Sequence, residues 1–116
     1  MSLIEGKHYY DNNYLTAVNG IVKIDRVYKV DESMFTECDY DKLGEIYKEL
    51  PGFIGDYFGC PYWYGLDYEF YLTISFEPVG LQLTGLLYQN EFEDWERTFH
   101  TLLEKADFPY IEECIP

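Results

Sequence analysis

The chain has 116 residues, of which 22 are acidic and 8 basic, so its formal net charge at pH 7 is −14. This charge argues against direct binding to nucleic acid or to anionic membranes, because both depend on Lys and Arg side chains. It favours a basic protein partner, although a negative charge also serves solubility alone. A hydrophobic fraction of 47% is ample for a core, and the length predicts a single domain over residues 1–116.

The cysteines and the N-terminus indicate a cytoplasmic protein. Cys38, Cys60 and Cys114 form no CxxC pair, so neither a disulfide scaffold nor a zinc site is expected. The first residues lack the basic and apolar regions of a signal peptide. No apolar run approaches the ~20 residues that a membrane span needs.

A hairpin and a helix are expected in the first half of the chain. Residues 14–18 and 21–30 are rich in β-forming residues and flank Asn19-Gly20, the dipeptide most typical of a two-residue hairpin turn. From Asp39, apolar residues at helical spacing predict a helix of about 11 residues. Pro51-Gly52 ends it. Its apolar face consists of Leu43, Ile46, Tyr47 and Leu50.

The middle of the chain reads as a loop followed by a second hairpin. Residues 53–68 are punctuated by glycines and a proline, so a structured loop with at most a short strand is expected, and not a regular element. From Glu69 to Glu77 apolar and polar residues alternate, which indicates a strand with one buried face. The leucines of residues 81–87 continue that face on a return strand, with Gly85 as a bulge or a point of close packing.

The last element is an amphipathic helix. We expect Asn90 to cap it, with Glu93 completing a capping box. Its apolar stripe must lie on the sheet. The predicted fold class is therefore α+β, an antiparallel sheet of about four or five strands with two helices packed on it. The stripe consists of Phe92, Trp95, Phe99, Leu102, Leu103 and Ala106.

The sequence carries no pattern for catalysis, for a metal or for a cofactor. Neither His8 nor His100 belongs to a metal-ligand motif, and the common phosphate-binding and hydrolase motifs are absent. Residues 39–50 begin like a calcium-binding EF-hand loop, but Leu43 and Leu50 stand where calcium needs oxygen ligands. We therefore expect a binding protein and not an enzyme.

Residues 53–71 combine many aromatic residues with acids and contain no Lys or Arg. A glycine-rich loop cannot bury all of these rings, so several are expected at the surface beside carboxylates. Such a surface suits Arg side chains of a basic partner, which stack on rings and pair with carboxylates. A satellite core under the loop and a carbohydrate site are the competing interpretations. The candidate partner-binding residues are Asp56, Tyr57, Tyr62, Trp63, Tyr64, Asp67, Tyr68 and Glu69.

The run SFEPVGLQLTG at residues 75–85, followed by the acidic EFEDW at residues 91–95, resembles small bacterial immunity proteins. These are cytosolic inhibitors encoded beside polymorphic toxins or toxins of contact-dependent growth inhibition, and the resemblance covers roughly residues 69–106. It implies a protein that binds a cognate toxin domain, often a basic nuclease, and covers its active site or substrate surface. No interface residue is carried over by motif.

Two other functions are kept beside this one. A nucleic-acid mimic that inhibits a DNA- or RNA-processing enzyme would share the negative charge, but it would need carboxylates spaced like phosphates and would leave the rings unexplained. A small-ligand or carbohydrate-binding domain would need a deep pocket lined by residues 62–68.

Overall fold

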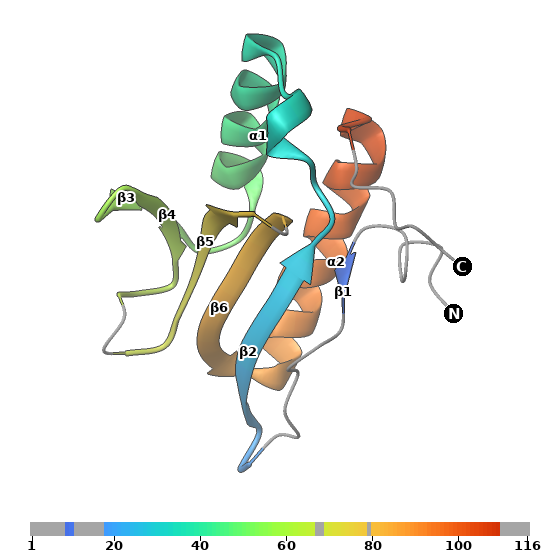
Figure 1. The fold of residues 1–116 in the computed structure, drawn as a ribbon. Helices are drawn as coiled ribbons and strands as arrows, with labels where there is room; N and C mark the ends of the chain where they lie inside the picture. The colour runs from blue at the N-terminus through green and yellow to red at the C-terminus, as the bar shows by residue number, and fades with distance from the viewer. Residues whose placement is uncertain (1–8, 11–17, 67–68, 79, 110–116) are drawn as a thin grey trace.

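The computed structural model describes residues 9–10, 18–66, 69–78 and 80–109, and the strand expected over residues 14–17 lies outside them. The predicted α+β class is confirmed: a six-stranded antiparallel sheet in the order β1-β2-β6-β5-β4-β3 carries two α-helices. In Figure 1, α2 runs behind the sheet, α1 stands at its upper end, and neither covers the face turned to the viewer. The elements are β1 (Tyr9–Tyr10), β2 (Ile21–Tyr28), the 3-10 helix η1 (Glu32–Met34), α1 (Glu37–Glu49), β3 (Phe53–Tyr57), β4 (Cys60–Trp63), β5 (Tyr71–Glu77), β6 (Gly80–Tyr88) and α2 (Gln89–Ala106).

The hairpin predicted from the alternating pattern is β5–β6, whose pairing runs without a shift from Tyr71↔Leu86 to Glu77↔Gly80. Gly85 marks close packing and not a bulge. A Cβ at that position would come within 2.2 Å of the Tyr71 carbonyl oxygen, so any side chain would force the two strands apart.

The Asn-Gly turn is also confirmed. Val18 and Ile21 exchange backbone hydrogen bonds of 2.9 and 3.1 Å, and both residues between them have positive φ, 56° at Asn19 and 78° at Gly20. Two positive φ values define the type I′ turn, which matches the twist of the strands that it joins.

The two helices begin at positions other than those expected. α1 begins at Glu37 because Thr36 caps it: the Thr36 N–H donates to Asp39 at 2.9 Å, and the Asp39 N–H donates back to Thr36 Oγ1 at 3.3 Å. The bond from the Thr36 backbone lowers the pKa of Asp39. The expectation that Asn90 caps α2 is wrong, because β6 passes directly into the helix and Tyr88, its N-cap, makes no side-chain capping bond.

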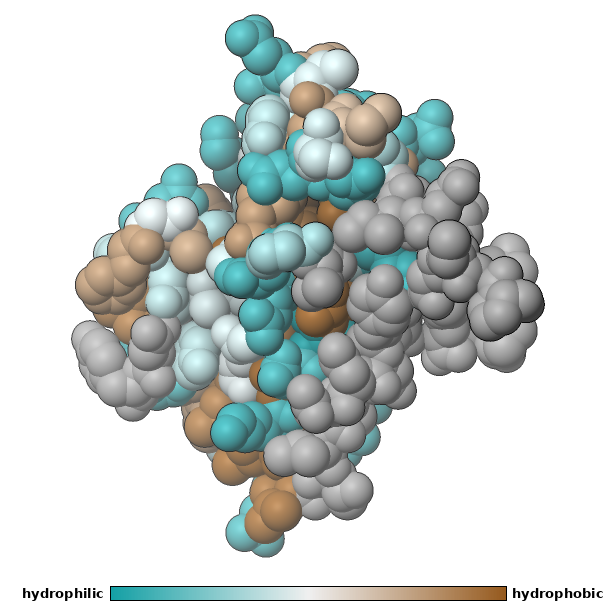
Figure 2. Space-filling view, viewed as in Figure 1, coloured by the Kyte–Doolittle hydropathy of each residue, from teal (hydrophilic) through white to brown (hydrophobic). Residues whose placement is uncertain are grey.

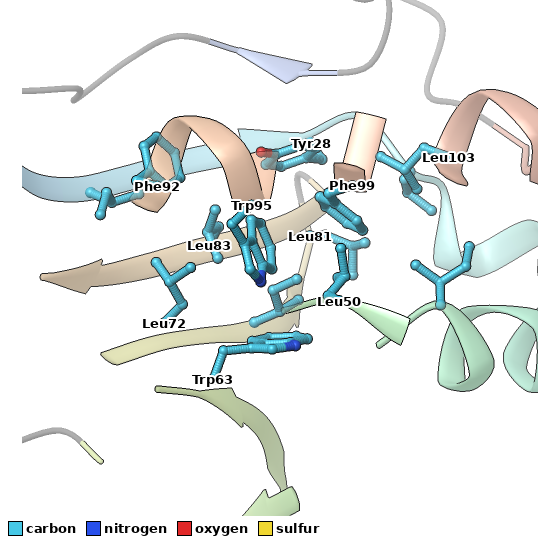
Figure 3. Packing of buried hydrophobic residues seen from close by; sticks show 14 of the residues in the cluster. Tyr28, Leu50, Trp63, Leu72, Leu81, Leu83, Phe92, Trp95, Phe99 and Leu103 are labelled. Carbon is cyan, nitrogen blue, oxygen red and sulfur yellow. The ribbon is translucent and has the colours of Figure 1, made fainter. Parts of the chain in front are cut away.

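The predicted stripe of α2 packs on the sheet and meets the apolar side of α1 in one core. Trp95 lies edge-on to Trp63 with ring centroids 5.1 Å apart, and Phe99 lies against both Trp95 and Tyr28 (Figure 3). Leu43 and Ile46 of α1 and Leu50, its C-cap, are buried in the same cluster. The aromatic rings supply much of this apolar area, since each buries more surface than an aliphatic side chain.

Residues 53–63 form the regular hairpin β3–β4, which corrects the expected irregular loop. The two residues of its turn, Phe58 and Gly59, have φ values of 55° and 82°, so this turn has both φ values positive, as in type I′. The pairing of the two strands is interrupted between Phe53 and Gly55, where the register shifts as in a β-bulge. A phenylalanine at the first turn position is not a hairpin signal, so the sequence pattern does not predict this turn.

Candidate functional site

The hairpin β3–β4 extends from the edge of the sheet. β4 pairs with β5 only at Tyr62↔Thr73 and Trp63↔Leu72, and β3 pairs only with β4. The strand ends near the turn therefore pair only with each other, and Figure 1 shows them reaching away from the body of the sheet.

Strand alternation sends the rings of this hairpin to opposite sides of the sheet. Trp63 turns toward the helices, is 0% exposed, and donates from Nε1 to the Tyr47 carbonyl oxygen at 3.1 Å. Tyr62 turns the other way but is itself only 4% exposed. The expectation that these two rings lie at the surface is therefore wrong. Trp63 belongs to the core, and Tyr62 supports more exposed rings.

Tyr64 is placed apart from the hairpin rings. It is half-buried, its φ is 72°, and its ring lies over Gly52, where a Cβ would come within 2.7 Å of it. Burial raises the pKa of its phenol, and the carboxylates of Glu91 and Asp94 in α2 raise it further.

The remaining predicted residues fall into three groups. Glu69 is exposed and accepts a hydrogen bond from the Leu66 N–H at 3.2 Å, which holds it in its own turn. Asp67 and Tyr68 lie outside the described residues. Asp56 and Tyr57 are exposed on β3, so of the eight predicted residues these two lie at the surface of the hairpin.

Four rings form a cluster on the helix-free face, which we call the hairpin patch: Tyr57, Phe58, Tyr62 and Tyr71. Tyr57 and Phe58 are 41% and 80% exposed, and each lies edge-on to Tyr62 with centroids 6.2 Å apart. Tyr71 lies on the other side of Tyr62 at 6.2 Å. Figure 2 shows apolar atoms at the left edge of the molecule, where Figure 1 places this hairpin. The patch thus has a buried ring beneath and two exposed rings above.

Phe58 is the member of the patch that the candidate residues omitted, and it is the most unusual. The same turn geometry occurs at Asn19-Gly20, where the first residue is one that tolerates positive φ. A bulky side chain in this conformation is an outlier that costs about 1–2 kcal/mol. Phe58 also leaves most of its ring in water. Neither property stabilises the fold, and such outliers concentrate at functional positions.

Replacing Phe58 with asparagine should therefore raise the free energy of unfolding by about 1 kcal/mol, reduced somewhat by the lost contact with Tyr62. Urea denaturation measures the change. The reverse substitution in the other turn, Asn19→Phe, is the matched control and should lower the free energy of unfolding. A lower free energy of unfolding in Phe58→Asn would show that the Phe58 ring stabilises the fold.

The segments that form the patch contain acids and no bases. In the sequence no Lys or Arg occurs between Lys48 and Arg97, so β3 to β6 and the first turns of α2 carry acids and no bases. The two bounding cations pair locally, Lys48 with Glu45 at 3.4 Å and Arg97 with Asp94 at 2.7 Å. These segments are therefore negatively charged. A base on the same face of the sheet is the exposed Lys23 of β2, whose strand partner Leu86 pairs in turn with Tyr71.

The other polar cluster is buried between β2 and α2. Glu96 accepts hydrogen bonds from Arg26 and from the Tyr28 hydroxyl, the latter at 2.6 Å, and its Oε2 lies 3.7 Å from Nε2 of His100. Arg26 and His100 are 5% and 7% exposed. The cluster joins the sheet to the helix, and its burial distinguishes it from a site open to substrate.

Among the described residues, no group of three or more His, Cys, Asp and Glu side chains is arranged to hold a metal ion. Within the same residues, neither helix is long and apolar enough to cross a membrane. Comparison of the chain with protein-family models, with curated proteins and with solved structures finds no match.

Proposed function

We propose that this protein binds a basic protein domain and neutralises it, in the manner of a bacterial immunity protein acting in the cytoplasm on its toxin. The observation that carries the proposal is Phe58: a strained, 80% exposed ring at the end of a projecting hairpin. It lies on a part of the chain that has no cation from residue 49 to residue 96. A basic partner with an apolar pocket would recognise an apolar side chain on a segment that carries acidic residues and no basic ones.

The two properties would act at different stages of binding. The net charge of −14 attracts a basic partner over a distance and raises the association rate. Insertion of Phe58 and contact with Tyr57 then slow dissociation, because buried rings dominate interface energies. Neutralisation follows if the covered surface of the partner holds its active site or its substrate path.

The nucleic-acid mimic stays the second candidate, favoured by one feature of α1. Glu37, Asp41, Glu45 and Glu49 are all exposed and recur at every fourth position, so they form a row of carboxylates about 6 Å apart along the helix. This row, the α1 ridge, does not include the hairpin patch. Charge changes in the two places therefore separate the two modes of binding.

Both modes can be tested on the protein encoded in the neighbouring reading frame or on a basic protein retained by the chain at low salt. We expect one basic domain to bind, with an affinity that falls at least about tenfold between about 50 and 200 mM NaCl. Calorimetry on the purified pair measures the affinity across that salt range. Binding that does not respond to salt, or the absence of any basic partner, would contradict the proposal.

Two charge-reversed variants locate the interface. Asp56→Lys, on the hairpin, should weaken binding about tenfold or more, and Glu45→Lys, on the α1 ridge, should change it by no more than about threefold. Both positions are exposed, so both variants should fold. The opposite pattern would support the mimic.

A further inference from the structure

A cleft of about 610 Å³ lies on the other side of the hairpin, between α1 and β3–β4. This volume is within the range of pockets that hold small molecules. It differs from the pocket that a carbohydrate site was expected to use, because none of residues 62–66 lines it. Its apolar walls include Leu43, Tyr47, Phe53, Ile74 and Phe76.

Gly44 lines this cleft from the interior of α1. Glycine is among the least favourable residues inside a helix, so such a position usually has a packing reason. Among the described residues none exists, since a Cβ at Gly44 would meet no atom of theirs within 4 Å. Because Gly44 has no side chain, the cleft stays open at this position.

The polar groups of the cleft favour a positively charged occupant. Tyr47 lines the cleft, and its hydroxyl makes no hydrogen bond to any described residue. Burial, then Cys60 and Asp56, raise the pKa of that phenol, so it stays neutral and can donate or accept. Asp56 is an exposed carboxylate on the wall, and Lys48, which also lines the cleft, lies 3.4 Å from Glu45, so these three side chains together carry one negative charge.

We propose that this cleft binds a small organic cation: an ammonium or guanidinium group carried on an apolar or aromatic body. The body would lie against Phe53 and Phe76, and the cation would approach Asp56 and the ring and hydroxyl of Tyr47. Carboxylates and the faces of aromatic rings both attract organic cations. The cleft shares Asp56 with the surface of the proposed function but not Phe58, so Phe58 variants separate the two sites.

Three probes of similar shape test the charge preference: phenethylammonium, 2-phenylethanol and 3-phenylpropionate, titrated at constant ionic strength into the ¹⁵N-labelled protein. We expect the ammonium to bind with a Kd of roughly 1 mM, as suits so small a ligand, and to shift the amide signals of Gly44 and Gly59. The alcohol should bind at least about threefold more weakly and the carboxylate more weakly still. No shift with the ammonium, or equal binding of the carboxylate, would overturn the proposal.

Variants then connect the response to the cleft. Gly44→Leu should abolish the ammonium response by filling the cleft, and Gly44→Ala should reduce it, while the better helix formers keep or raise the Tm. Asp56→Asn should weaken the ammonium about threefold and leave the alcohol unchanged. Phe58→Asn should alter neither. An unchanged ammonium response in Gly44→Ala and Asp56→Asn would place the probe elsewhere and overturn the proposal, even if the leucine variant failed to fold.

Discussion

Replacing Trp63 with alanine is expected to lower the free energy of unfolding by about 3–5 kcal/mol, which is a large part of the stability of a domain of this size. The side chain is fully buried and lies edge-on to both Trp95 and Tyr47. Its Nε1 also donates to the Tyr47 carbonyl oxygen, so truncation removes packing, two ring contacts and a hydrogen bond. Urea denaturation followed by circular dichroism measures the loss.

The matched control is Phe58→Ala in the same hairpin, which removes an 80% exposed ring and should change the free energy of unfolding by no more than about 0.5 kcal/mol. The pair of variants separates an internal ring from a surface ring. A stable Trp63→Ala protein that had lost only its binding to a partner would restore Trp63 to the surface and contradict the fold described here.

Replacing Glu96 with leucine should lower the free energy of unfolding by about 3 kcal/mol or more, because the buried carboxylate accepts hydrogen bonds from both Arg26 and Tyr28. The Arg26 and Glu96 side chains are only 7% and 13% exposed. A double-mutant cycle pairs this change with Arg26→Met. The double variant should lose about 1–3 kcal/mol less free energy of unfolding than the two single variants lose in sum.

The surface pair of Arg97 and Asp94 is the control for that cycle. Its side chains are 70% and 72% exposed, so Asp94→Asn should cost less than about 1 kcal/mol and show little coupling. Additive effects of the Arg26 and Glu96 changes would mean that the ion pair does not join β2 to α2.

The elements that could be predicted are those whose periodicity is set by one buried face. The alternation from Glu69 to Glu77 produced β5, and the stripe of α2 produced a helix whose residues Phe92, Trp95, Phe99 and Leu103 are buried. Local turn chemistry sufficed at Asn19-Gly20 because both residues favour positive φ.

The hairpin β3–β4 could not be predicted in the same way, because its turn uses a residue that opposes the turn geometry. Phe58 adopts a φ of 55° only with the support of the strands on either side. The bulge before Gly55 further breaks the alternation that would identify β3. A conflict between local preference and structure is itself the signal, and it becomes visible only once the backbone is known.

The composition of residues 53–71 pointed to the segment that holds the hairpin patch, but not to which of its rings face outward. The partition of Trp63 and Tyr62 between the two sides depends on the pairing of β4 with β5, which no local pattern in a glycine-rich stretch specifies. The cleft beside α1 could not be predicted from the sequence either, since Gly44 and Asp56 come together only through packing of the helix on the hairpin.

We propose that Phe58 is held in an unfavourable conformation because it anchors a basic protein partner. The most direct test measures two quantities on one variant, Phe58→Asn: the free energy of unfolding and the Kd for that partner. The account predicts a protein that is more stable by about 1 kcal/mol and that binds at least about thirtyfold more weakly, as expected when an interface anchor is removed. A variant that is more stable and still binds within about threefold of the wild type would contradict it.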